Sequence, residues 1–95
     1  MVIGSTISLT LYGGDDCDDT EHVVGRLRAW GVAFRLVILE HDPDAEQFVI
    51  FINGGLRSTP TLVFGDGRHK TILTEPTDEE LAEALTRAGF VISMS

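Results

Sequence analysis

Basic residues are scarce in this 95-residue chain, because seven Lys and Arg stand against fifteen Asp and Glu, for a net charge of −8. Nucleic-acid binding requires clustered Lys and Arg to contact phosphates, and anionic membrane surfaces also attract basic segments. We therefore expect neither a nucleic-acid nor a membrane partner. Such an acidic surface keeps a small domain soluble, and it also suits a basic protein partner.

Cysteine is nearly absent, because Cys17 is the only one in the chain. No internal disulfide can form in this sequence, whereas small secreted domains often carry several. No apolar run approaches the roughly 20 residues of a membrane-spanning helix, and the first residues lack the pattern of a secretory signal. The sequence therefore predicts a single-domain cytoplasmic protein, since its length suits one core.

Apolar periodicity predicts seven elements in the order strand, helix, strand, helix, strand, strand, helix. Two strands joined by a crossover helix should be parallel, and the closing hairpin should be antiparallel. We expect an α/β fold with a mixed four-stranded sheet and helices on each face. The predicted strands and helices cover 6–12, 18–31, 32–40, 41–55, 59–73 (two strands with a tight turn at 65–67) and 75–89.

Helix boundaries are predicted from local signals. Residues Asp18 with Glu21, and Thr77 with Glu80, have the spacing of a capping box. Asp42 before Pro43 is typical of a helix start, and Gly54 and Gly89 suit helix ends. The predicted strand at 32–40 is apolar enough to be buried, and Phe48, Val49, Phe51, Ile52 and Trp30 are expected in the core.

The element order, with a cysteine just after the first strand, resembles the thioredoxin fold, and the motifs narrow it to the glutaredoxin family. "LYGGDDCDDT" (11–20) matches the glutaredoxin spacing of strand, Tyr, four residues and C-x-x-C. "FINGGLRSTPTLVFGDG" (51–67) resembles the segment that leads into a cis proline and the third strand. "LEHDPDAEQFV" (39–49) is similar to the mycoredoxin-like, actinobacterial branch of the family.

This resemblance implies a thiol–disulfide oxidoreductase with Cys17 as the nucleophile, in a domain over 7–89 between an N-terminal extension (1–6) and a C-terminal tail (90–95). Thr20 stands where the second cysteine of the motif would be, so only a monothiol mechanism is open. Mycothiol or glutathione would be the cosubstrate, and the acidic surroundings favour the thiol without carboxylates. We expect a monomer that reduces protein mixed disulfides, with no metal and no tightly bound cofactor.

The resemblance also implies a set of thiol-binding positions around the nucleophile. A cis Thr59–Pro60 bond would present the Thr59 backbone to the bound thiol. Arg57 either meets an acidic group near the site or is an exposed loop residue. The positions carried over are Tyr12, Thr20, Arg57, Thr59, Pro60, Thr77 and Asp78.

Two opposing effects act on the Cys17 thiol in the sequence. A helix N-terminus stabilises a thiolate, whereas aspartates close to the sulfur oppose it. From the four flanking aspartates we predict a Cys17 pKa near or above the free value of about 8.5. A protein with so slow a thiol could instead be a non-catalytic binding module whose acidic face takes a basic partner. The four aspartates are Asp15, Asp16, Asp18 and Asp19.

Overall fold

A computed structural model describes residues 7–93, in which strands and helices alternate in the predicted order. The start of the predicted first strand, at Thr6, and the extension over 1–6 lie outside the described residues. The elements are β1 (Leu9–Gly13), α1 (Asp18–Ala29), β2 (Arg35–Ile38), the 3-10 turn η1 (Leu39–His41), α2 (Pro43–Ile52), β3 (Thr61–Phe64), β4 (Thr71–Thr74) and α3 (Asp78–Arg87).

The four strands form one mixed sheet in the order β2-β1-β3-β4. Strand β1 pairs in parallel with β2 and antiparallel with β3, and β3 pairs antiparallel with β4. Leu11 lies opposite Leu36 on one side and Leu62 on the other. The predicted sheet is therefore confirmed, and β1 and β3 occupy its centre.

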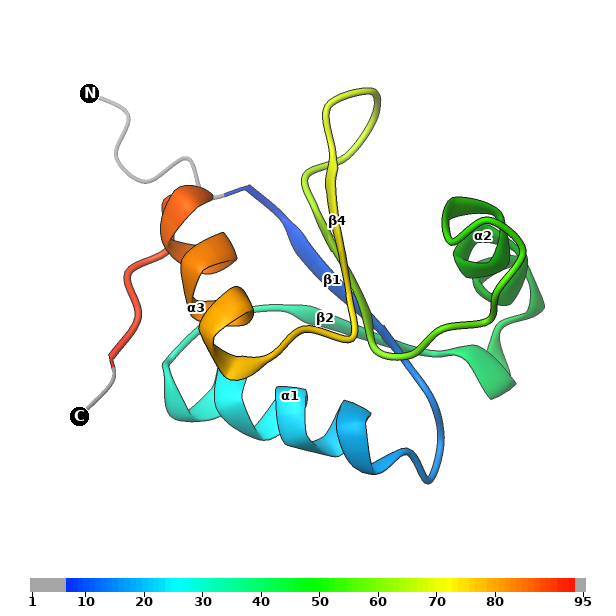
Figure 1. Ribbon diagram of the computed structural model, residues 1–95, viewed down its shortest axis with the longest axis horizontal. Coiled ribbons are helices and arrows are strands. Elements are labelled where there is room, and N and C mark those ends of the chain that lie inside the picture. Colours follow the sequence, from blue (N-terminus) through cyan, green and yellow to red (C-terminus); the bar gives the residue numbers. More distant parts are fainter. Residues whose placement is uncertain (1–6, 94–95) are drawn as a thin grey trace.

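Helices cover both faces of the sheet, with α1 and α3 on one face and α2 on the other (Figure 1). The main core lies between the sheet and the α1–α3 layer, where Leu11, Leu27 and Leu85 are fully buried. Trp30 is buried in the same cluster, as predicted. Among residues 7–93, no helix has both the length and the apolar character that crossing a membrane requires.

Two of the three helix starts follow the predicted signals. The Thr77–Glu80 capping box is present at α3. At α2, the Asp42 carboxylate accepts a hydrogen bond from Ala45 N, and proline occupies the first turn. The predicted Asp18–Glu21 box at α1 is wrong, because the helix already begins at Asp18 and Cys17 is its N-cap.

Three other departures concern β2, α2 and the connection between β3 and β4. Strand β2 is shorter than predicted. None of its four residues is buried, because β2 lies at the edge of the sheet and pairs with β1 alone. In α2 only Val49 is fully buried, and Phe51 points outward with 82% of its surface exposed. The tight hairpin turn predicted at 65–67 is a longer connection that spans 65–70 between β3 and β4.

The segment after α3 belongs to the packed domain. Phe90 makes an edge contact with Phe64, at 6.3 Å between ring centroids, and Ile92 packs against the core. Ser93 N donates a hydrogen bond to Trp30 O at 3.1 Å. Residues 90–93, which the prediction assigns to a C-terminal tail, therefore contact the folded domain.

Candidate active site

Cys17 lies where strand β1 turns into helix α1. Gly13 ends the strand against the methyl group of Thr20, and a side chain on Gly13 would clash with that methyl. Asp16 takes a left-handed conformation with φ of 57°, which turns the chain into the helix. Cys17 is then the N-cap of α1, and its half-buried side chain makes no capping bond. The first amides of the helix are therefore free to face the sulfur.

Hydrogen bonds hold the pKa of the Cys17 thiol below its usual value, and the Thr20 hydroxyl is their largest contributor. Burial raises the pKa, whereas the backbone N–H groups of Thr20 and Asp19 and the Thr59 hydroxyl lower it. The predicted raised pKa is thus wrong in direction. These donors stabilise the thiolate at short range, and exposed carboxylates act through water that screens their charge.

Thr20 and Thr59 contribute differently to the site. The Cys17 sulfur lies 3.6 Å from Thr59 Oγ1, within hydrogen-bond contact. Thr20 is buried, and its oxygen accepts the N–H of Gly14 at 3.1 Å. The bond from Gly14 uses only a lone pair of the oxygen, so the hydroxyl proton remains available to donate to the Cys17 thiolate. Thr20, which stands in place of a second cysteine, therefore stabilises the thiolate of Cys17.

The Thr59–Pro60 peptide bond is cis, as predicted. Pro60 is buried, and its carbonyl accepts a hydrogen bond from Glu75 N at 2.9 Å. This bond ties the start of β3 to the segment before α3. Thr59, Pro60 and Cys17 thereby come together from distant parts of the sequence.

The four aspartates around Cys17 all lie exposed at the surface. Asp15 lies near His41, with 3.5 Å between Oδ2 and Nε2, and its own N–H donates to Glu40 Oε1 at 2.9 Å. Asp18 and Asp19 occupy the first turn of α1, where carboxylates complement the partial positive charge of the helix. These carboxylates surround the site and give it an acidic face.

Arg57 meets two acidic groups, and it is also an exposed loop residue, so it has features of both alternatives that the sequence left open. Its guanidinium donates to Glu46 Oε2 at 2.6 Å and lies 3.1 Å from Glu40 Oε2. The pKa of Glu40 is lowered, and the largest cause is the hydrogen bond from Asp15 N. The Arg57 guanidinium lowers it as well. Glu40 therefore links the loop before Cys17 to the loop before Pro60, and Arg57 is occupied within the chain.

Asp78, at the start of α3, is bound by two side chains of α1. Its carboxylate accepts from His22 Nε2 at 2.8 Å and from Arg26 Nε at 3.1 Å. The hydrogen bond from His22, together with the charge of Arg26, lowers the pKa of Asp78. Thr77 is likewise used as the cap of α3. Of these two predicted thiol-binding residues, Asp78 holds α3 against α1, and Thr77 stabilises the start of α3 itself.

Tyr12 makes its aromatic contact with helix α2. It packs on Phe48 of α2, with 5.4 Å between ring centroids, on the face of the sheet that α2 covers. Lys70 lies 5.4 Å from the centroid of the same Phe48 ring. Tyr12 therefore anchors α2 to the sheet beside the site.

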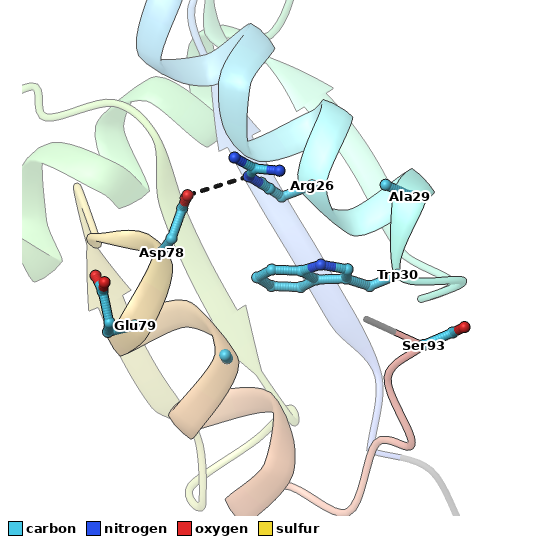
Figure 2. Close-up of a pocket in the computed structure, with 7 residues that line it drawn as sticks. Arg26, Ala29, Trp30, Asp78, Glu79 and Ser93 are labelled. Carbon is cyan, nitrogen blue, oxygen red and sulfur yellow. Dashed lines mark hydrogen bonds and ion pairs between the residues drawn. The ribbon is translucent and has the colours of Figure 1, made fainter. Parts of the chain in front are cut away.

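Two hollows follow the line where α1 faces α3. A small groove of about 160 Å³ lies beside Pro60 and is bordered by His22 and Glu75. A larger one of about 600 Å³ lies further along α1, beyond the Arg26–Asp78 ion pair, where Trp30 points toward α3 (Figure 2). Of these two hollows, the small groove is the one that adjoins the cis proline.

Sequence reasoning missed the residues that hold the site together. His22, Glu40 and Glu46 are ordinary surface residues by sequence, and no local pattern pairs them with partners far along the chain. Burial or pairing of Glu40 cannot be read from the residues next to it. Within 7–93, no three His, Cys, Asp or Glu side chains gather as a metal site.

Comparisons with known proteins agree with this arrangement. Two Mycobacterium tuberculosis proteins, "Putative glutaredoxin MT3292" (strain CDC 1551) and "Putative glutaredoxin Rv3198A" (strain H37Rv), are each 34% identical over 82 residues, which cover 86% of this chain and 94% of theirs. The X-ray structure of protein XcR50 from X. campestris has a TM-score of 0.60 and 28% identity, covering 84% of this chain and 97% of that one. No protein-family model matches. With the sheet order above, the structural likeness confirms the predicted thioredoxin fold.

Proposed function

The chain belongs to the glutaredoxin family, and on that premise we propose that it is a monothiol thiol–disulfide oxidoreductase with Cys17 as the nucleophile. The observation that carries this proposal is the set of donors from Thr20, Thr59 and the first amides of α1, which lower the pKa of Cys17. A lowered pKa increases the thiolate fraction at neutral pH, and the thiolate is the attacking species.

The reaction follows from the chain having one cysteine. The Cys17 thiolate attacks the small-thiol sulfur of a protein mixed disulfide, so the protein leaves as a thiolate and Cys17 carries the small thiol. A second small thiol, as its thiolate, attacks that new disulfide. It releases Cys17 and forms the symmetrical small-molecule disulfide. The net reaction consumes one free small thiol and converts the protein mixed disulfide into the protein thiol and the symmetrical small-molecule disulfide, so no resolving cysteine is needed.

The backbone beside the cis proline is proposed to bind the small thiol. Thr59 lies against the sulfur, and Pro60 borders the 160 Å³ groove. Asp19 and Glu75 also border this groove, so carboxylates on the small thiol would be repelled there. We propose a thiol without carboxylates, such as mycothiol, over glutathione.

The surroundings of the reaction follow from its chemistry. A free, reactive thiol requires a reducing compartment, and we propose the cytoplasm. The acidic face also suits a non-catalytic role in binding a basic protein. The lowered pKa of Cys17 favours the catalytic role, because a binding surface has no need of a stabilised thiolate.

The test is turnover on a small mixed disulfide, with each of the two small thiols supplied in turn as reductant. We expect turnover that depends on Cys17 and is faster with the neutral thiol. Thr20→Cys, which permits an internal disulfide, should not be required for turnover. An unmodified protein that is inert with both thiols would refute the catalytic proposal and leave the binding role.

A further inference from the structure

A further groove, the α1/β2 groove, adjoins the loop that leads into Cys17. It has a volume of about 440 Å³ and lies between helix α1 and edge strand β2. Its apolar side is formed by Val24, Leu36 and Ile38, and Leu36 is 40% exposed for lack of a covering element. The exposed carboxylates at its other end are those of Asp15, Asp16 and Glu21.

The inner end of the α1/β2 groove adjoins the nucleophile. Gly14 lines the groove, and a Cβ added to Gly14 would lie 3.2 Å from Cys17 Cβ. Thr20 lines it as well, and the Thr20 hydroxyl stabilises the thiolate. A molecule in this groove would therefore lie beside the loop that leads into Cys17, while the small groove beside Pro60, which shares no lining residue with it, stays open for a second one.

Gly25 gives an independent indication that the groove accommodates another molecule. Glycine inside a helix costs about 1 kcal/mol relative to alanine. Among the nine described glycines, Gly25 alone has neither a positive φ nor an atom within 4 Å of its missing Cβ. No packing within the described chain requires a glycine there. Its absent side chain keeps the middle of the α1/β2 groove open.

We propose that the α1/β2 groove binds a Lys or Arg side chain of the substrate protein, close to the cysteine whose mixed disulfide Cys17 attacks. This proposal rests on the proposed function and adds the class of protein substrate. A Lys or Arg stem can lie along Val24 and Leu36 while its cationic head meets the carboxylates. Arg28 is the single cationic residue that lines the groove, so the three carboxylates leave the groove with a net negative charge.

The experiment uses peptides that contain one cysteine as a mixed disulfide with a small thiol. The two peptides of a pair differ only in having Lys or Gln at one position. Six pairs place that position at each of the three residues on either side of the cysteine. At the best position we expect kcat/KM to be at least about threefold higher for Lys, the size expected of an exposed charge pair. High salt should reduce this preference. Equal rates for Lys and Gln at every position would overturn the proposal.

Substitutions at Gly25 test the groove itself. Gly25→Gln places a long neutral side chain in the groove, and Gly25→Ala is the matched control that adds only a Cβ with free space around it. We expect Gly25→Gln to remove the Lys preference and Gly25→Ala to keep it. Glu21→Gln should reduce the preference for the Lys peptide over the Gln peptide about threefold. Unchanged turnover of all three variants on a small mixed disulfide shows that the fold and the chemistry are intact.

A binding measurement separates this inference from the proposed function. If no disulfide is turned over, the catalytic proposal fails, and the Cys17→Ser protein is titrated with the Lys and Gln peptides carrying serine for cysteine. Amide NMR shifts at Gly25 and Leu36 with the Lys peptide alone would support the groove. Absence of shifts there, or equal shifts with both peptides, would refute it.

Discussion

Helices α1 and α3 both begin with a cluster of acidic residues, yet their first turns are used in opposite ways. At α3, Thr77 Oγ1 accepts from Glu80 N at 3.1 Å, and the Glu80 carboxylate accepts from Thr77 N at 2.8 Å. At α1, the N-cap is Cys17, and no side chain caps the helix. The amides of Asp19 and Thr20 serve the sulfur instead and lower its pKa.

This difference shows that the number of acidic residues near a helix start does not determine its chemistry. The start of α3 satisfies its own amides, so it contributes stability and holds α1 through Asp78. The start of α1 leaves amides for an anion that the protein makes itself, the thiolate of Cys17. The identity of the N-cap residue, rather than the charge around it, separates a structural helix start from a reactive one.

The largest effect is expected from making the two starts alike with Cys17→Ser. Serine is a favoured N-cap residue and should cap α1 as Thr77 caps α3. Turnover on a small mixed disulfide should vanish, and the free energy of unfolding should stay the same or rise by about 1 kcal/mol. Denaturant unfolding and a turnover assay measure the two. Residual turnover would show that Cys17 is not the nucleophile.

The next effect concerns Thr20. Thr20→Val removes the hydroxyl, so the pKa of Cys17 should rise, and alkylation at neutral pH should slow about tenfold for each unit of rise. The rate should climb with pH through the pKa of the folded protein, because only the thiolate reacts. The stabilisation from this thiolate is present above the unfolded pKa and is lost as pH falls through the folded one.

Thr20→Ser is the control, because it keeps the hydroxyl and should keep the low pKa. Thr20→Val also leaves Gly14 N without its acceptor, which should lower stability by about 1–3 kcal/mol. Alkylation rates from pH 5 to 10 give both pKa values. The same pKa in Thr20→Val and the unmodified protein would mean that the backbone amides act alone.

A smaller effect is expected at the other helix start. Thr77→Ala removes the cap of α3 and should lower the free energy of unfolding by about 1 kcal/mol, or the Tm by about 4–8 °C for a domain of this size. Thr77→Ser should restore most of the loss. If Thr77→Ala instead changed the pKa of Cys17 as strongly as Thr20→Val does, the two helix starts would not be independent.

The smallest effect is expected from the exposed carboxylates. Asp16→Asn combined with Asp18→Asn should speed alkylation of Cys17 by less than about threefold at low salt, and by less still at high salt. Stopped-flow alkylation in two ionic strengths measures it. A tenfold acceleration would mean that the aspartates govern the thiol after all.

The fold was largely predictable because its signals are local. Strand alternation, the Asp42–Pro43 start and the Thr77–Glu80 box each need only a few adjacent residues, and all three are confirmed. The cis bond before Pro60 followed from the resemblance of its segment to the glutaredoxin family. The exposure of β2 did not follow, because an apolar sequence does not tell an edge strand from a central one. The outward Phe51 did not follow either, because several apolar residues in a row do not tell which of them faces the sheet.

The candidate site was predictable in its members more than in their roles. Cys17, Thr20 and Thr59 do come together, whereas Arg57 and Asp78 are occupied by partners within the chain. The direction of the Cys17 pKa was missed because distance and donor geometry decide it. A count of nearby aspartates contains neither quantity, and an exposed carboxylate weighs less than a hydroxyl in contact with the sulfur.

Protonation of a single side chain, Glu40, would affect two contacts that hold the loops beside Cys17. Its carboxylate holds Asp15 N with one oxygen and Arg57 with the other, and both contacts keep its pKa below the usual range. That attachment persists at neutral pH and is lost as acidification carries Glu40 through its lowered pKa. The leucines of the core have no group that titrates. In acid, protonation of Glu40 would weaken both contacts, so the loop before Cys17 would be held less firmly to the loop before Pro60.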